Sequence, residues 1–267
     1  MKLSLIIAYT YSVDIFRLIG LIKLMSSIKN QLYRDFETIL VEDTQGTGIS
    51  KFPFKKDVNL VIPITDPENR KFNKSWVMNV GAKNARYNGM VFIDAEISFG
   101  NDYLNKIIEG TQKYEFFNGW SEYVCMSGRD NPKERRHYWP KTIRAMIGSF
   151  YSTKDFYFHK LGGYNENYFG YGAEDNDICY RAKYVLEKDE IKKNNFDFFY
   201  EEYSPIPMIN YTIYHNYHHW HPSTGPDPLN PDREKILNVT IKRPQEVINK
   251  LVTTNIGNFK HPTLINL

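Results

Sequence analysis

The chain has 267 residues, 42% of them hydrophobic and 24% charged, and its formal net charge is +3. This length allows one large domain or two small ones with a substantial core, while so small a net charge gives no electrostatic argument for a nucleic-acid partner. The 2 cysteines lack metal-ligand spacing, which argues against a disulfide scaffold and suits a reducing compartment.

The opening segment, residues 1–12, combines one lysine with a short apolar run and lacks a small-residue cleavage site. This pattern favours a first strand over a signal peptide. No apolar stretch approaches the ~20 residues that span a bilayer. We therefore expect a cytoplasmic protein without a transmembrane segment.

The first third of the chain alternates between short apolar runs, typical of buried parallel strands, and segments in which apolar residues recur at helical spacing. Such alternation predicts an α/β fold with a right-handed, mostly parallel central sheet. The expected strands are 2–9, 36–43, 58–64 and 89–94, and the expected helices are 13–30 and 74–88.

Acidic residues end two of these strands. Asp43 closes the second strand and Asp94 closes the fourth. Because ligands bind beyond the carboxyl ends of strands in open α/β sheets, we expect both side chains at a functional site.

The second half of the chain is less regular, and no internal repeat or low-complexity linker divides it. We expect a helix over 102–113, a strand over 118–128, a charged loop over 129–141, a strand and a short helix within 145–164, a helix over about 175–187, a polar connection over 189–207, a strand over 208–214, and helices near 231–238 and 243–252.

Aromatic residues make up 15% of the chain, with 20 Tyr and 17 Phe. Tyrosine and tryptophan offer flat apolar faces with a polar rim, which suits surfaces on which sugars stack. A coding bias toward Tyr, Phe, Asn, Lys and Ile explains the same composition equally well.

Two groups of side chains suit a divalent metal ion. Asp94 and Glu96 share a face if the chain is extended there, and a carboxylate pair suits Mn²⁺ or Mg²⁺, although D-x-E alone is a weak motif. The second group consists of histidines, and imidazole is a common ligand of transition ions. The alternative is that these histidines belong to a surface cluster of aromatic and histidine side chains. Four histidines lie within seven residues, namely His215, His218, His219 and His221, and the spacing of His218 and His221 allows both to bind one ion from a turn.

The segment YFGYGAEDNDICYR, residues 168–181, places two glycines ahead of a run of acids. A solvated helix start would explain some of the acids, since carboxylates favour the positive end of the helix dipole and Asp177 can pair with Arg181 one turn on. It does not explain Gly170 and Gly172, which allow a sharp turn or a close approach to a ligand.

Two segments, FNKSWVMNVGAKNARYNGMVFIDAE (72–96) and GGYNENYFGYGAEDNDICYR (162–181), resemble GT-A glycosyltransferases. The nearest patterns are those of the β-1,4-galactosyltransferases and the chondroitin-polymerase-like members of glycosyltransferase family 2. In those enzymes F-N-[RK] and N-V-G precede D-x-D, and G-W-G-G-E-D-D-D precedes a metal-binding histidine and N-P-x-R. Here HP at 221–222 precedes NPDR at 230–233.

The resemblance implies a GT-A fold, that is, a Rossmann-like α/β/α sandwich, in one catalytic domain over 1–267. Its parts would be a nucleotide-sugar-binding half over 1–96, an acceptor and metal half over 97–225, and a C-terminal helical tail over 226–267.

The resemblance also implies roles for single residues on the donor side. Asp43 matches an acid directed at the uracil or ribose, Phe72 and Lys74 match the element along the nucleoside, and Tyr171 replaces a tryptophan that packs on sugar. Asp94 matches the first acid of D-x-D.

The resemblance likewise implies which residues bind the metal and the acceptor. Glu96 matches the metal-binding second acid of D-x-D, and His221 and His218 match histidine ligands. Glu174 and Asp175 match the acidic pair that holds the acceptor, with Asp175 at the position of the catalytic base.

Some positions depart from the family pattern. Glu96 replaces aspartate, Tyr171 replaces tryptophan, Ala173 replaces glycine, Asn176 replaces an acid, and Ala8 stands where proline is usual. None of these changes removes a required chemical group, but the identity of the donor sugar does not carry over.

These features predict an inverting, metal-dependent glycosyltransferase that moves a sugar from a UDP-sugar to a hydroxyl of a saccharide acceptor, with Mn²⁺ or Mg²⁺ as cofactor. One alternative is a retaining transferase. A second is a transferase that modifies nucleic acid through the basic segments 133–141 and 181–188. A third is a non-catalytic nucleotide-sugar-binding module, which a UDP-release assay would separate from an enzyme.

Overall fold

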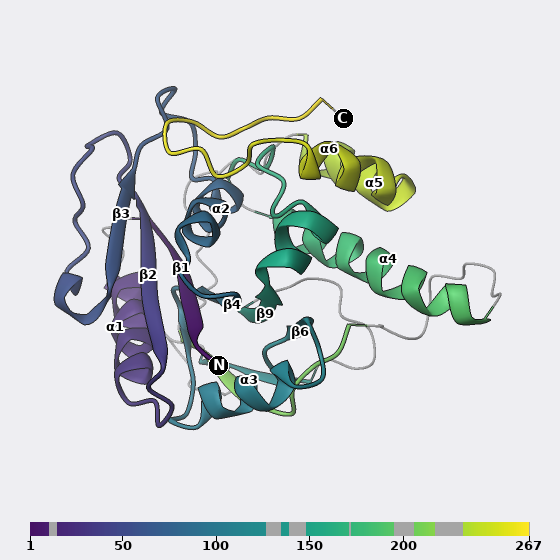
Figure 1. Cartoon of the computed structure of the whole chain (residues 1–267). Coiled ribbons are helices and arrows are strands. Elements are labelled where there is room, and N and C mark those ends of the chain that lie inside the picture. The colour runs from purple at the N-terminus through teal and green to yellow at the C-terminus, as the bar shows by residue number, and fades with distance from the viewer. Residues whose placement is uncertain are drawn as a thin grey trace.

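The computed structural model describes residues 1–10, 15–126, 135–138, 148–170, 172–194, 206–216 and 232–266. A six-stranded central sheet forms its middle layer (Figure 1). The strands are β1 (Leu3–Thr10), β2 (Phe36–Asp43), β3 (Leu60–Ile64), β4 (Gly89–Asp94), β6 (Phe116–Asn118) and β9 (Ser149–Thr153), in the spatial order β3-β2-β1-β4-β9-β6.

Strands β1 to β4 run parallel, and only β9 is antiparallel to its neighbours β4 and β6. The predicted fold class, α/β with a mostly parallel central sheet, is therefore confirmed. The register pairs Thr10 with Asp43 and Ala8 with Asp94, so both acids lie at the carboxyl edge of the sheet, on either side of β1.

Helices cover both faces of the sheet. Alternate residues of β1 belong to different cores: Ile6 packs in one core with α2, whereas Leu5 and Ile7 pack in the other with α1. This period-2 division is what a strand buried on both faces requires. The helices are α1 (Ile15–Lys29), α2 (Lys74–Asn84), α3 (Tyr103–Thr111), α4 (Glu174–Asn194), α5 (Arg233–Lys242) and α6 (Pro244–Val252), with a 3-10 turn at Lys55–Asp57 and a π-helix at Phe156–Leu161.

Helix α2 packs closely on the sheet because of Gly81. A Cβ atom at this position would lie 2.5 Å from Ile6 Cγ2 and 3.3 Å from Val41 Cγ2. The glycine of the N-V-G element therefore sets the distance between α2 and strands β1 and β2.

A second sheet of four strands lies beside the first. Its order is β5-β10-β7-β8, with β10 parallel to β7 and antiparallel to β5, and β7 antiparallel to β8. The strands are β5 (Ile97–Ser98), β7 (Glu122–Met126), β8 (Arg135–Tyr138) and β10 (Thr212–Asn216).

Two predictions were wrong in their bounds. The helix expected over 74–88 ends at Asn84, because the backbone amides of Arg86 and Tyr87 bond to the side chains of Glu37 and Ser4. The strand expected over 118–128 is two strands, β6 and β7, separated by a turn in which the Asn118 amide bonds to the Trp120 carbonyl.

Three further predictions fail where the structure depends on distant partners. The loop expected over 129–141 contains β8, which forms by pairing with β7. Helix α4 runs on to Asn194, into the polar connection expected over 189–207. The strand expected over 208–214 is β10, four residues later at its start, where it pairs with β7.

Within the described residues, no helix combines the length and the apolar composition needed to cross a membrane.

Candidate active site

Three carboxylates converge on one ammonium group at the carboxyl edge of the central sheet. Lys74 Nζ lies 2.8 Å from Asp94 Oδ1 and 2.9 and 3.0 Å from the two oxygens of Asp175, and the nearest oxygen of Glu174 is 3.8 Å away. The four side chains are 11–17% exposed, so the cluster is mostly buried but reaches the surface.

Lys74 is positioned by the start of α2. Asn73 caps this helix, since its Oδ1 accepts from the Trp76 amide at 2.9 Å. The Asn73 amide group also donates to the carbonyl of Glu166 at 2.8 Å, which ties the cap to the loop before α4. Residues 73 and 74 of the F-N-[RK] element thus hold the helix start and the ammonium group in place.

Asp94 is held by the backbone of the neighbouring strand segment. Its Oδ2 accepts from the Gly148 amide at 2.9 Å, and its own amide donates to the Gly148 carbonyl at 2.9 Å. Both Asp94 oxygens therefore have partners, one on Gly148, the residue before β9, and the other on Lys74.

The loop before α4 adopts the left-handed conformations that its glycines permit. Gly170 has φ +76° and Gly172 has φ +100°. Ala173, at the position where the family carries glycine, also has a positive φ of 76°, a conformation that a side chain disfavours. This turn directs Glu174 and Asp175, the first residues of α4, toward Lys74.

The acids of the 174–177 run face two different sides. Glu174 and Asp175 meet Lys74, whereas Asp177 pairs with Arg181 inside the protein at 2.6 Å, with both side chains fully buried. The predicted Asp177–Arg181 pair is confirmed. One buried oxygen of Glu174, Oε2, has no hydrogen-bond partner among the described residues.

The electrostatics of the cluster follow from three acids around one base. Burial raises the pKa of Asp175 to about 8; Lys74 opposes this shift, while Glu174 and Asp94 reinforce it. Burial lowers the pKa of Lys74, but the carboxylates of Asp175, Asp94 and Glu174 outweigh it, and the pKa of Lys74 lies well above its ordinary value. The three carboxylates therefore favour the charged form of Lys74, whereas burial favours the protonated form of Asp175.

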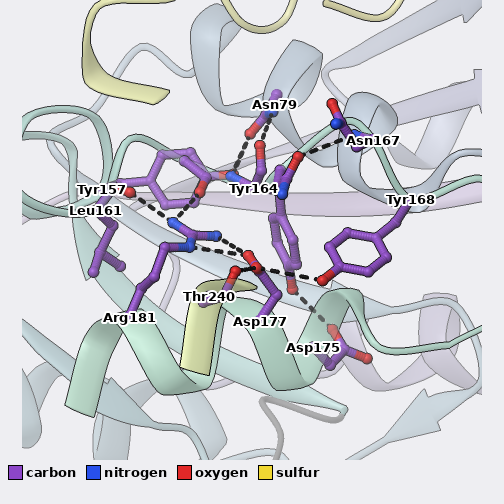
Figure 2. Close-up of polar contacts among 12 residues, drawn as sticks. Asn79, Tyr157, Leu161, Tyr164, Asn167, Tyr168, Asp175, Asp177, Arg181 and Thr240 are labelled. Atoms are coloured by element: carbon purple, nitrogen blue, oxygen red, sulfur yellow. Dashed lines mark hydrogen bonds and ion pairs between the residues drawn. The ribbon is translucent and has the colours of Figure 1, made fainter. Parts of the chain in front are cut away.

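A network of buried polar side chains supports this loop from behind (Figure 2). Asn79 on α2 donates from its amide nitrogen to the Tyr164 carbonyl and to Glu166, both at 2.8 Å, and accepts from the Tyr164 backbone amide at 2.9 Å. Glu166 in turn accepts from the backbone amides of Gly257 and Thr263 in the C-terminal segment. Helix α2, the loop and the C-terminal segment are thereby joined through two side chains.

Sequence reasoning did not single out Asn79, Tyr164 or Glu166. A signal was present for Asn79, because a polar residue follows the apolar Trp76, Val77 and Met78 on a helix where almost every side chain is buried. A buried amide needs partners, and the loop supplies them.

Asp43 lies at the same edge of the sheet as Asp94 but belongs to a different local structure. Its oxygens accept from the backbone amide of Gln45 at 3.0 Å and from the Gln45 side chain at 2.9 Å. Burial raises the pKa of Asp43, Gln45 opposes the shift, and the nearby charge of Asp66 reinforces it. The cluster around Lys74 does not include Asp43.

Phe72 is half-buried against the core, and its carbonyl accepts from the Gly170 amide at 2.8 Å. The two motif segments, 72–96 and 162–181, are thus in direct contact. Tyr171 lies outside the described residues.

Only some of the predicted metal ligands lie in the described residues. Ala95 and Glu96 form a turn between β4 and β5, so the condition under which Asp94 and Glu96 would share a face, an extended chain, is not met. Among the described ranges, no group of three or more His, Cys, Asp or Glu side chains lies together as a metal site would require. Glu96 is half-buried and is a hard carboxylate donor that fits Mn²⁺ or Mg²⁺, while His218, His219 and His221 lie outside the described residues.

Comparison with known proteins supports the resemblance. A family model described as the N-terminal domain of galactosyltransferase matches residues 131–203, less than half of the chain but including the whole acidic run. The resemblance to galactosyltransferases is therefore confirmed for this part of the chain. No curated protein matches in sequence.

Solved structures of TarS from S. aureus match with TM-scores of 0.44–0.45. One TarS structure is 16% identical in sequence, and the alignment covers 68% of this chain and 33% of the TarS chain. TarS 1-349 in complex with UDP is 17% identical, with 70% and 55% covered, and the UDP-GlcNAc complex is 16% identical, with 68% and 53% covered. The chain thus spans between a third and just over half of these proteins, and a likeness this remote assigns neither a ligand nor an activity to it.

Proposed function

We propose that this chain is an inverting, metal-dependent glycosyltransferase that transfers a sugar from a UDP-sugar to a hydroxyl of a saccharide acceptor, with 1–267 as one catalytic domain. The observation that carries the proposal is the convergence of Glu174, Asp175 and Asp94 on Lys74 at the carboxyl edge of the sheet. Ligands bind at this edge in open α/β sheets. The galactosyltransferase match over 131–203 supports the same class of reaction.

Asp175 is the general base of the proposed reaction. Its pKa of about 8 suits a base that works near neutral pH, since such a group both binds and releases the proton readily. The acceptor hydroxyl gives its proton to Asp175 while its oxygen forms a bond to the anomeric carbon. The bond from that carbon to the UDP oxygen breaks, and its electron pair leaves with UDP.

Glu174 is the acceptor-binding partner of the base. Its Oε2 is buried and lacks a hydrogen-bond donor among the described residues. A carboxylate oxygen in this state costs free energy until a donor arrives, and a sugar hydroxyl supplies one.

The residues that would bind the donor lie at the start of α2 and at the ends of β2 and β4. Asp43 and Phe72 would contact the nucleoside, Lys74 would supply a fixed positive charge, and Tyr171 would pack on the sugar. A bound Mn²⁺ or Mg²⁺, held by Asp94 and Glu96 with His218 and His221, would offset the charge on the diphosphate leaving group.

The experiment is a UDP-release assay with several UDP-sugars, saccharide acceptors and Mn²⁺, followed by NMR of the anomeric configuration of the product. We expect UDP release, an inverted product, and loss of activity in EDTA and in both Glu96→Ala and His221→Ala. UDP-sugar binding without any release would contradict an enzyme and leave a binding module. Full activity in EDTA would contradict the role of the metal.

A further inference from the structure

Tyr164 lies in the loop between the π-helix and α4, and its hydroxyl group points at Asp175 (Figure 2). Its Oη donates to Asp175 Oδ1 at 3.0 Å, the same oxygen that accepts from Lys74 at 3.0 Å. The other oxygen, Oδ2, accepts only from Lys74, at 2.9 Å, within the described part of the chain. The two oxygens of the carboxylate therefore have different surroundings.

The Tyr164 side chain is immobilised by its neighbours. The residue is 1% exposed, and its ring packs edge-on against Phe92, with centroids 6.4 Å apart, and tilted against Phe150, with centroids 6.1 Å apart. Asn79 bonds both its backbone amide and its carbonyl. A rotamer held on every side presents its hydroxyl in one place, unlike the long side chain of Lys74.

The hydroxyl donates to the ionised form of Asp175, which is the form that acts as a base. Burial raises the pKa of Tyr164 well above its ordinary value, and the nearby charge of Asp175 raises it further. The phenol therefore keeps its proton, and a protonated phenol facing a carboxylate donates to it.

We propose that Tyr164 is a positioning residue for the general base: its hydroxyl holds Oδ1 of Asp175 and so presents Oδ2 to the acceptor hydroxyl. This inference rests on the proposed function, because it assigns Asp175 the proton transfer. Orientation of this kind affects the chemical step and leaves ground-state binding of donor and acceptor unchanged.

The test is Tyr164→Phe, which keeps the ring and removes only the hydroxyl. We expect kcat to fall on the order of tenfold, as for a lost hydrogen bond to a charged group, with the KM values of donor and acceptor unchanged. The matched control is Tyr168→Phe. It removes a buried hydroxyl that lies 3.4 Å from Asp177, an acid on the same helix as Asp175, and it should leave kcat unchanged.

A double variant separates positioning from a general structural role. If Tyr164 acts through Asp175, then Tyr164→Phe should cost nothing further in an Asp175→Asn background. A further tenfold loss in that background, or a wild-type kcat in the single variant, would overturn the inference. Absence of UDP release by the wild-type protein with every UDP-sugar would instead overturn the proposed function itself.

Discussion

Two carboxylates lie two residues apart at the start of α4, and each has the same kinds of partner. Asp175 bonds to a cation, Lys74, and to a tyrosine hydroxyl. Asp177 also bonds to a cation, Arg181, and lies 3.4 Å from the hydroxyl of Tyr168 (Figure 2). The chemistry of the two sites is thus nearly identical, and the difference between them lies in how completely each is satisfied.

The Asp177 site is closed. Arg181 binds Asp177 through two nitrogens and the carbonyls of Leu161 and Gly163 through a third, and Thr240 donates to Asp177 at 2.5 Å. Both charged side chains are fully buried. A buried pair with every group satisfied is a structural joint, here between α4, the π-helix and α5.

The Asp175 site is open. One ammonium group faces three carboxylates, Glu174 Oε2 lacks a donor among the described residues, and the cluster is partly exposed. Unequal charge and an unsatisfied oxygen are costs that a purely structural joint would avoid, and they accumulate where a ligand is to bind. The two acids therefore differ in how far their hydrogen-bonding groups are satisfied, and not in the residue types around them.

The largest expected effect breaks the open site. Asp175→Asn keeps the shape of the side chain but cannot accept the proton, so transfer should fall by about 10²–10⁴-fold. UDP-sugar binding, measured by calorimetry, should stay near that of the wild type, because the proposed donor contacts come from other residues. Transfer at the wild-type rate would reduce Asp175 to a helix-start acid.

The next effect breaks the closed site. Arg181→Met keeps most of the volume but leaves Asp177 as an unpaired buried charge, which should cost about 3–5 kcal/mol in the free energy of unfolding. Urea denaturation measures this loss. Lys242→Met, at an exposed position on α5, is the control and should change stability by less than ~0.5 kcal/mol. An equally small effect of Arg181→Met would contradict the structural role of the pair.

The raised pKa of Asp175 should make the free energy of unfolding depend on pH. The pKa of Asp175 is raised to about 8 in the folded protein from 3.8, so the folded state holds a proton that the unfolded state releases between these values. This contribution to stability is fully present below pH 3.8 and is lost as the pH rises toward 8. Asp175→Asn lacks it, so its unfolding free energy relative to the wild type should increase from pH 4 to pH 8. A pH-independent difference in thermal or urea denaturation would contradict the raised pKa.

The smallest effect concerns the turn that leads into both sites. Ala173 has φ +76°, which costs a residue with a side chain about 1 kcal/mol or more. Ala173→Gly should therefore raise the free energy of unfolding by up to ~1 kcal/mol, after the entropy of glycine is subtracted. The control is Ala182→Gly, at a buried position inside α4, the helix that follows the turn; this substitution should lower the free energy of unfolding. Destabilisation by both substitutions would show that Ala173 is unstrained.

Much of the fold could be predicted from the sequence. The predicted bounds 36–43 and 89–94 are those of β2 and β4, and the strand predicted over 2–9 differs from β1 by one residue at each end. The strand β8 could not be found in this way, because its residues are charged and it exists through pairing with β7. Propensity describes a segment alone, whereas an edge strand depends on its neighbour.

The candidate site divides in the same manner. Glu174, Asp175, Asp94 and Lys74 were expected at one site from the resemblance, and the structure brings their side chains together. Their roles remain predictions, as do those of Asp43, Phe72, Glu96 and of His218, His221 and Tyr171, which lie outside the described residues.

Contacts between residues that are close together in the chain could be predicted from the sequence. The pair Asp177–Arg181 follows from a spacing of four residues, because the geometry of a helix brings such positions onto one face. The left-handed turn before α4 follows from Gly170 and Gly172. The contact between Lys74 and Asp175, which are 101 residues apart, and the hydrogen bond from Tyr164 to the same acid depend on tertiary packing. Contacts over such separations depend on how the sheet, α2 and the loop pack together, and no local periodicity specifies them.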